Sequence, residues 1–243
     1  MLPKVSCLCP TYGRPQCLEE AIFSFLTQDY QGEKELVILN DLADQTLIFD
    51  HPDVKIINVK NRITPLGLKF NETARHATGS VFAVWEDDDI YLPHRLTYSV
   101  QRLNQHGLFH TNIAYYEQEE RKIIPAGNLF HCNLMVTNIA FWAIDGYTVN
   151  EDRGTIDLGL MSRLAHRFGP FTQSIPQGDQ FYIYRWGTSG GGYHASGWGS
   201  GDVSELAKQT VNSAIQNGTM PQGTIELIPR WKYNYLEYLP CAT

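Results

Sequence analysis

Residues 81–93 read Val-Phe-Ala-Val-Trp-Glu-Asp-Asp-Asp-Ile-Tyr-Leu-Pro, an apolar run followed at once by four carboxylates. A short, continuous apolar run is typical of a strand that is buried on both faces of a sheet. Four adjacent carboxylates repel one another, and a hard divalent cation such as Mg²⁺ or Mn²⁺ relieves that repulsion. The stretch therefore predicts a buried strand over residues 81–85 with a cation-binding turn at its carboxyl end. A solvated acidic turn without a cation is the alternative.

The chain up to about residue 105 alternates between two periodicities. Three more apolar runs predict strands, and three segments with apolar residues on one face predict helices. The strands are expected at residues 5–9, 35–39 and 54–59, and the helices at residues 15–26, 67–78 and 93–105. Such alternation is typical of a mostly parallel sheet with helices on its faces, so we expect an α/β fold.

The second half of the chain is richer in aromatic residues. Its strands are expected at residues 113–117, 134–143 and 180–186 with a hairpin arm at 121–125, and its helices at 157–167 and from Asp202 to about residue 215. Residues 225–239 carry no regular pattern and are expected to be irregular. Residues 187–201 hold seven glycines, which predicts a flexible loop that carries function.

The composition limits the class of protein. The 243 residues are 43% hydrophobic and 19% charged, which predicts a single globular domain over residues 1–243 and excludes a disordered or fibrous chain. The formal net charge of −7 lacks the basic excess that is typical of proteins that bind nucleic acids or anionic membranes.

Cysteine usage and the lack of long apolar segments bear on the location of the protein. The five cysteines include no Cys-x-x-Cys pair, so we expect reduced, buried thiols and no zinc site. The sequence shows no signal-peptide pattern and no run of about 18 apolar residues. We therefore expect a cytoplasmic protein without a transmembrane segment.

Polar motifs follow the predicted strands in a fixed order. Ligands of open α/β sheets bind at the carboxyl ends of the strands. The motifs are Pro10-Thr11-Tyr12-Gly13-Arg14, Gln28-Asp29-Tyr30, Asn40-Asp41, the helix from Gly67 to Gly79, and Asp87-Asp88-Asp89-Ile90-Tyr91-Leu92-Pro93. Over residues 4–170 this ordered set resembles family 2 glycosyltransferases of the GT-A fold.

The resemblance implies both a fold and a reaction. The fold would be a Rossmann-like, mixed but mostly parallel sheet flanked by helices. Residues 1–110 would form the nucleotide-binding half, and residues 111–243 the acceptor-binding half with the glycine-rich loop 187–201. The reaction would move a sugar from a nucleotide-diphospho-sugar, typically a UDP-sugar, with Mn²⁺ or Mg²⁺ bound and with inversion at the anomeric carbon.

The resemblance also implies roles for individual residues at the donor site. Asp41 would accept a hydrogen bond from the nucleobase, and Asp88 would ligate the metal, with Asp87 nearer the ribose and Asp89 as a substitute ligand. The other residues implied to contact the nucleotide sugar are Pro10, Thr11, Tyr12, Arg14 and Asn71. From the residues alone, Asp41 also fits a turn aspartate that closes a strand, and Asn71 fits a structural amide.

An inverting transfer needs a general base that takes the proton of the acceptor hydroxyl. The family carries this base in the pattern Glu-Asp-x-x-Leu-x-x-Arg, which residues 156–163 match with Ile156 in place of the Glu. Asp157 is therefore the predicted base, and Glu151 or Asp152 would serve if the register were shifted. A helix N-cap is the structural alternative for Asp157.

Two residues of the C-terminal part complete the predicted site. His194, in the glycine-rich loop, would ligate the metal, and Arg185 would balance the charge of the leaving diphosphate through its planar fork of donors. From the residues alone, His194 also fits a surface loop and Arg185 fits an ion pair at a strand end.

No motif identifies the acceptor. Residues 185–243 hold four basic and four acidic side chains together with several aromatic ones, which fit stacking on a sugar or a nucleobase as well as core packing. A saccharide acceptor is favoured, and a hydroxymethylated DNA base is less favoured because the chain is acidic. A non-catalytic nucleotide-sugar-binding module is a further alternative. A sugar-1-phosphate nucleotidyltransferase is disfavoured because residues 11–15 hold only one glycine.

Overall fold

The fold is taken from a computed structural model, which describes residues 1–128, 130–148, 156–185 and 203–240. The side chains of Asp157 and of residues 203–208 lie outside that description. The predicted loop at residues 187–201 lies outside it as well.

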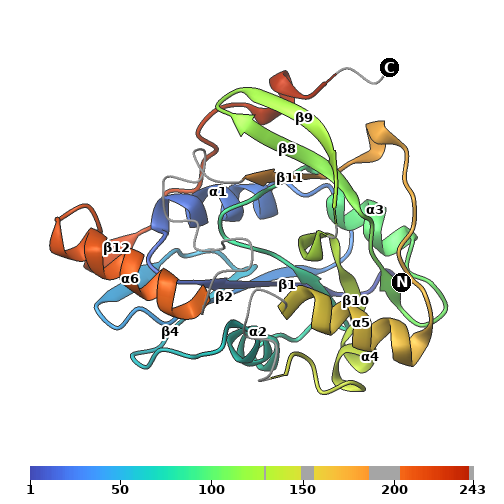
Figure 1. The fold of residues 1–243 in the computed structure, drawn as a ribbon, viewed down its shortest axis with the longest axis horizontal. Coiled ribbons are helices and arrows are strands. Elements are labelled where there is room, and N and C mark those ends of the chain that lie inside the picture. Colours follow the sequence, from blue (N-terminus) through green and yellow to red (C-terminus); the bar gives the residue numbers. More distant parts are fainter. Residues whose placement is uncertain (129, 149–155, 186–202, 241–243) are drawn as a thin grey trace.

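A six-stranded sheet with the order β4-β2-β1-β5-β10-β7 forms the centre of the molecule (Figure 1). Its strands are β1 (Val5–Thr11), β2 (Lys34–Asn40), β4 (Val54–Asn58), β5 (Val81–Val84), β7 (Leu108–Phe109) and β10 (Met135–Thr137). Strands β4, β2, β1 and β5 run parallel, whereas β10 is antiparallel to both β5 and β7. The predicted mixed, mostly parallel α/β sheet is confirmed.

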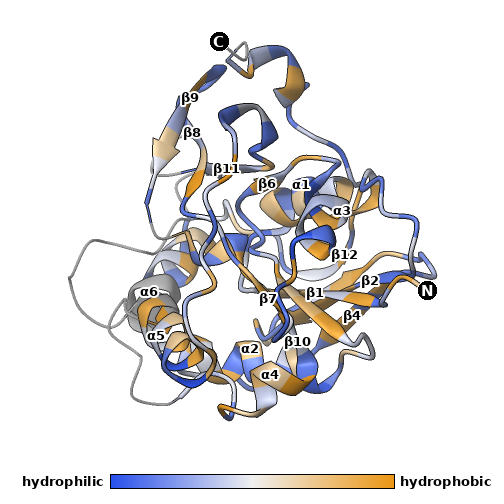
Figure 2. Cartoon of the chain, turned by 90° about the vertical axis from the view of Figure 1, so that its right-hand side faces the viewer, coloured by the Kyte–Doolittle hydropathy of each residue, from blue (hydrophilic) through white to orange (hydrophobic). Residues whose placement is uncertain are grey.

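Helices cover both faces of this sheet. They are α1 (Pro15–Leu26), α2 (Leu66–Arg75), α4 (Asn138–Trp142) and α5 (Ile156–Phe168). α1 lies on one face and the other three lie on the opposite face (Figure 1). The side chains of β1 alternate accordingly, because Cys7 packs on the α1 side and Leu8 on the α2 side. With both faces covered, the strands are mostly apolar, as Figure 2 shows for β1 and β2.

Smaller elements surround the central sheet. A four-stranded sheet, ordered β6-β11-β8-β9, packs on the α1 side (Figure 1). The strands are β6 (Ile90–Tyr91), β8 (Ile113–Glu119), β9 (Lys122–Gly127) and β11 (Tyr182–Arg185), with β3 (Gln45–Ile48) and β12 (Gly223–Glu226) forming a separate parallel pair. The remaining helices are α3 (Arg95–Gln101), α6 (Val203–Gln216) and the short 3₁₀ helices η1 (His131–Asn133), η2 (Gln177–Asp179) and η3 (Tyr235–Tyr238).

The predicted strand over residues 134–143 is wrong in its second half. The strand ends at Thr137, and α4 follows directly. The Thr137 hydroxyl accepts a hydrogen bond from the Ala140 backbone N–H at 3.4 Å. This is an N-cap, which favours a helix at that point over a longer strand.

Other boundaries differ less. The predicted helix over residues 67–78 ends at Arg75, and the helix predicted over 93–105 is the shorter α3. Residues 225 and 226, which were expected to be irregular, belong to β12 and pair with β3. The hydrogen bonds that form this pair join segments far apart in the chain, so the local pattern does not show them.

Cys7, Cys9, Cys17 and Cys132 are free, and their expected burial is confirmed. Within the part of the chain that the structure describes, no helix is both long enough and apolar enough to cross a membrane.

The order of the strands reverses next to β1. The chain runs from β1 to β2 and β4 on one side, and then returns to β5 on the other side. At such a reversal the connections leave in opposite directions, which opens a crevice outside the carboxyl ends of the two strands. The loop after β1 and the acidic turn after β5 therefore meet at this crevice.

Candidate active site

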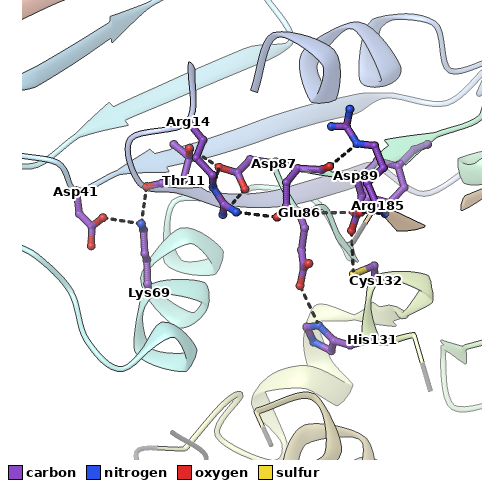
Figure 3. Close-up of polar contacts among 12 residues, drawn as sticks. Thr11, Arg14, Asp41, Lys69, Glu86, Asp87, Asp89, His131, Cys132 and Arg185 are labelled. Atoms are coloured by element: carbon purple, nitrogen blue, oxygen red, sulfur yellow. Dashed lines mark hydrogen bonds and ion pairs between the residues drawn. The ribbon is translucent and has the colours of Figure 1, made fainter. Parts of the chain in front are cut away.

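Side chains from the ends of β1 and β5 contact one another directly (Figure 3). The Thr11 hydroxyl donates to Asp87 Oδ2 at 2.5 Å. The Arg14 guanidinium lies 2.5 Å from Asp87 Oδ1 and 2.7 Å from Asp88 Oδ2. The loop that connects Thr11 to Arg14 contains Gly13 at a φ of +67°, where a Cβ would also lie only 2.9 Å from Val211 of α6. Glycine thus allows both the turn and the close packing of α6.

Asp41 lies at the end of β2 in a buried ion pair. Lys69 Nζ, from α2, is 2.5 Å from Asp41 Oδ1 and also 2.5 Å from the Thr11 carbonyl oxygen. The Ile63 backbone N–H donates to Asp41 Oδ2 at 2.8 Å. Burial lowers the pKa of Lys69 to about 8, although Asp41 acts in the opposite direction. The pair connects the ends of β1 and β2 to α2.

The guanidinium group of Arg62 stacks on the ring of Tyr12 beside this pair. The Arg62 guanidinium is 3.2 Å from the ring centroid of Tyr12 and 3.8 Å from Asp41 Oδ1. Arg62 and Lys69 were not predicted from the sequence. Lys69 stands between two apolar residues of an amphipathic helix, and only the fold reveals that its ammonium group reaches the ends of the strands.

Asp89 faces away from Arg14. Its carboxylate accepts hydrogen bonds from the Tyr182 hydroxyl at 2.6 Å and from the Arg185 backbone N–H at 2.8 Å. Asp89 is fully buried, and this burial, together with the nearby charge of Asp88, raises its pKa well above the usual range. These contacts attach the acidic turn to β11 and make Asp89 less accessible to a ligand than Asp88.

The acidic turn fits a hard divalent cation. Carboxylate oxygens of Glu86, Asp88 and Asp89 lie within 4.8 Å of one another. The donors are all oxygen atoms, which Mg²⁺ and Mn²⁺ prefer. Burial and the charge of Asp88 raise the pKa of Asp87 to about 6, even though Arg14 opposes that shift. The turn therefore retains uncompensated negative charge that a cation would neutralise.

Arg185 lies beneath the acidic turn. Its Nε donates to the Asp88 carbonyl oxygen at 2.5 Å, and its Nη1 bonds Glu20 and, at 3.0 Å, the Tyr235 hydroxyl. The side chain is only 1% exposed. The structure therefore brings Arg185 close to the turn but pairs its guanidinium with Glu20. This is the ion pair at a strand end that the sequence allowed as the alternative.

The other predicted residues are less central to the crevice. Asn71 donates to the Tyr147 carbonyl oxygen at 2.8 Å and accepts from the Tyr147 backbone N–H at 2.9 Å, which is the geometry of a structural amide. Pro10 is buried within β1. Asp157 is the second residue of α5.

The start of α5 lies against the start of α2. A Cβ on Gly67, at the beginning of α2, would lie 2.8 Å from Tyr147 Cβ and 3.5 Å from Ile156 Cδ1. The first turns of α2 and α5 therefore approach each other closely. His194, Glu151 and Asp152 lie outside the described residues, as does the Asp157 side chain.

A mostly parallel sheet with an acidic turn at its switch point is typical of α/β proteins that bind a ligand at the carboxyl ends of their strands. Residues 6–161 match the model of the family described as glycosyl transferase family 2, and the chain belongs to that family.

One curated protein and several solved structures resemble this chain. The chain is 28% identical over 185 residues to EpsE of Bacillus subtilis (strain 168), described as a candidate glycosyltransferase, and the match covers 66% of each chain. The mannosyltransferase PcManGT from Pyrobaculum calidifontis, in complex with GDP-Man and Mn²⁺, has a similar fold, with a TM-score of 0.60 and 19% identity over 91% of this chain and 66% of that one. Residues 1–349 of S. aureus TarS with UDP-GlcNAc give a TM-score of 0.60 and 14% identity, covering 88% of this chain and 67% of that chain.

Proposed function

We propose that this chain transfers a sugar from a nucleotide-diphospho-sugar, with UDP-sugars as the preferred class, to an acceptor hydroxyl group. The observation that carries the proposal is the contact of Thr11 and Arg14 with the carboxylates of Asp87 and Asp88 at the switch point. Membership in glycosyl transferase family 2 supports it.

The nucleoside would lie on the β2 side of the crevice. Asp41 would accept a hydrogen bond from the base, because each carboxylate oxygen has a lone pair beyond those used by Lys69 and Ile63. Tyr12 and Arg62 would form the adjacent wall for the base or ribose. In this proposal residues up to about 110 bind the donor, and the rest of the chain contributes to the acceptor side.

The diphosphate would lie over the acidic turn. Asp88 would hold a Mn²⁺ or Mg²⁺ ion there, with Asp89 as a substitute ligand, and His194 is proposed as a further ligand. When bound, the ion supplies the positive charge that stabilises the leaving diphosphate. Arg14 adds a positive charge beside Asp88. Arg185 would affect the diphosphate only indirectly, by holding the acidic turn in place through its hydrogen bond to the Asp88 carbonyl oxygen.

Asp157 would accept the proton of the acceptor hydroxyl as the bond to the diphosphate breaks. Its position at the start of α5, beside the first turn of α2, supports this role. A base on the face opposite the leaving group gives inversion at the anomeric carbon.

A saccharide is the proposed acceptor. The net charge of −7 disfavours a DNA acceptor. Among the described aromatic residues of the C-terminal part, Trp231 and Tyr235 are held by the fold: Trp231 Nε1 donates to Ser24 at 2.8 Å and the Tyr235 hydroxyl donates to Glu20 at 2.9 Å. Both side chains pack into or against the core.

A screen of nucleotide sugars tests the proposal. The full chain is incubated with each donor and Mn²⁺, with and without EDTA, and release of the nucleoside diphosphate is measured. We expect EDTA-sensitive release from one class of donor, accelerated by saccharides rather than by hydroxymethylated DNA. Binding of a donor without any release or transfer would favour the non-catalytic module, and acceleration by DNA alone would overturn the saccharide acceptor.

A further inference from the structure

A second group of metal-ligand side chains lies beside the acidic turn. Glu86, His131 and Cys132 each offer one ligand atom, and these atoms lie within 4.8 Å of one another. Glu86 belongs to the acidic turn, whereas His131 and Cys132 belong to η1 (Figure 3). The donors are oxygen, nitrogen and sulfur, unlike the all-oxygen group that includes Asp88 and Asp89.

The distance between Glu86 and His131 fits two ligands of one ion. His131 Nδ1 lies 3.8 Å from Glu86 Oε1, which is too long for a hydrogen bond. Two atoms bound tetrahedrally to one zinc ion at about 2.0–2.1 Å lie about 3.4 Å apart. A small adjustment of the partly exposed Glu86 side chain therefore suffices for both residues to bind the same ion.

Tyr147 holds the other ring nitrogen of His131. Nε2 forms a hydrogen bond with the Tyr147 hydroxyl. Phe70 packs against both rings, with centroid distances of 5.7 Å to His131 and 5.0 Å to Tyr147. Metal-binding histidines are commonly oriented by a hydrogen bond at their second nitrogen. The arrangement leaves Nδ1 directed toward Glu86, as ligation requires.

The group is buried on one side and open on the other. His131 and Cys132 are 4% and 5% exposed, whereas the Glu86 side chain is 29% exposed. The Cys132 Sγ lies 3.9 Å from Asp89 Oδ2, so the thiol is on the inner side of the turn. Three protein ligands with solvent access on one side are typical of zinc sites that keep a fourth position open.

We propose that Glu86, His131 and Cys132 bind a borderline divalent cation such as Zn²⁺ or Co²⁺, with a fourth position open to water or substrate. Nitrogen and sulfur donors favour such ions over Mg²⁺. The Cys132 thiol releases its proton to solvent when the ion binds. The proposal differs from the sequence-based expectation of no zinc site, which rested on ligand spacing, because these ligands come from two segments far apart in the chain. The proposal does not depend on the transferase activity.

Absorption spectroscopy with Co²⁺ as the probe tests the site. The full chain is treated with a chelator, desalted and titrated with Co²⁺. We expect a thiolate-to-cobalt charge-transfer band in the wild-type protein and its loss in Cys132→Ser. A missing band in the wild type, or a band that persists in Cys132→Ser, overturns the proposal.

Further variants separate this site from its neighbours. Cys17→Ser and Cys241→Ser are matched controls that should keep the band. Glu86→Gln changes a partly exposed residue, so the fold should persist by circular dichroism while Co²⁺ binding weakens at least tenfold; unchanged binding overturns the proposal. Asp88→Asn should keep the band while it loses Mn²⁺-dependent donor turnover, so that the two metal proposals succeed or fail separately.

Discussion

Lys69 and Asp41 form an ion pair with Nζ 2.5 Å from Oδ1, and their side chains are only 4% and 0% exposed. The lysine comes from α2 and the aspartate follows β2, so the pair ties the helix to the carboxyl end of the sheet. Because both charges are buried, each depends on the other for compensation.

We expect Asp41→Ala to lower the free energy of unfolding by about 3–5 kcal/mol, because it leaves the Lys69 charge buried without its partner. Urea unfolding monitored by circular dichroism measures the effect. Asp44→Ala, at an exposed position in the following turn, is the matched control and should change stability little. Weaker donor binding at unchanged stability would show that the pair is not a structural support.

Asp88→Asn should abolish Mn²⁺-dependent donor turnover without unfolding the chain, since it removes a ligand charge and keeps the size of the side chain. Nucleoside diphosphate release and calorimetric Mn²⁺ titration are the measurements. Asp50→Asn, an exposed aspartate elsewhere, is the control. Wild-type turnover that is equally fast in excess EDTA would contradict the metal role.

Asp157→Asn should keep donor affinity and reduce turnover by about 10²–10⁴-fold, because only proton transfer in the transition state is lost. Asp157 lies in the first turn of α5, where replacing a carboxylate by an amide costs at most about 1 kcal/mol of helix-dipole stabilisation, so a loss of stability does not explain the effect. Glu151→Gln and Asp152→Asn are the controls. If either of them loses turnover while Asp157→Asn stays active, the base lies upstream.

Arg185→Met should destabilise the protein by about 3–5 kcal/mol, because it leaves the buried Glu20 carboxylate without its guanidinium partner. A double-mutant cycle with Glu20→Gln, followed by urea unfolding, should give a coupling free energy above about 1 kcal/mol. Full stability of Arg185→Met with a large loss of turnover would instead place this guanidinium on the diphosphate.

His110 should make the protein less stable in mild acid. Its ring nitrogens lie 3.0 Å from Thr172 Oγ1 and 3.0 Å from the Phe130 carbonyl oxygen, and burial lowers its pKa from 6.5 to about 4. Between these values the unfolded chain binds a proton that the folded chain does not. Stability from this group is therefore complete above about pH 6.5 and falls as the pH drops toward 4.

The contribution of His110 to the free energy of unfolding should fall by about 2 kcal/mol between pH 7 and pH 5. Urea unfolding at the two pH values measures it. The drop should shrink in His110→Gln and persist in His106→Gln, which changes an exposed histidine. Equal pH dependence in the wild type and His110→Gln would contradict the assignment.

The sequence by itself determined the elements that depend on local periodicity. Strands β1, β2, β4 and β5 and helices α1, α2 and α5 stand where the apolar patterns predict them, because each pattern repeats over several residues within one element. The polar ends of these strands were also predicted to bind the ligand, since ligands of open α/β sheets lie at the carboxyl ends of the strands.

Only the tertiary structure decided how the polar groups pair. Lys69 reaches Asp41, Arg185 reaches Glu20, and η1 brings His131 to Glu86, all across long separations in the chain. A sequence pattern reports which face of its own element a residue occupies, whereas these contacts depend on the packing of elements against one another. The short pair of β3 and β12 was missed for the same reason, because four-residue strands are stabilised by distant partners rather than by local preference.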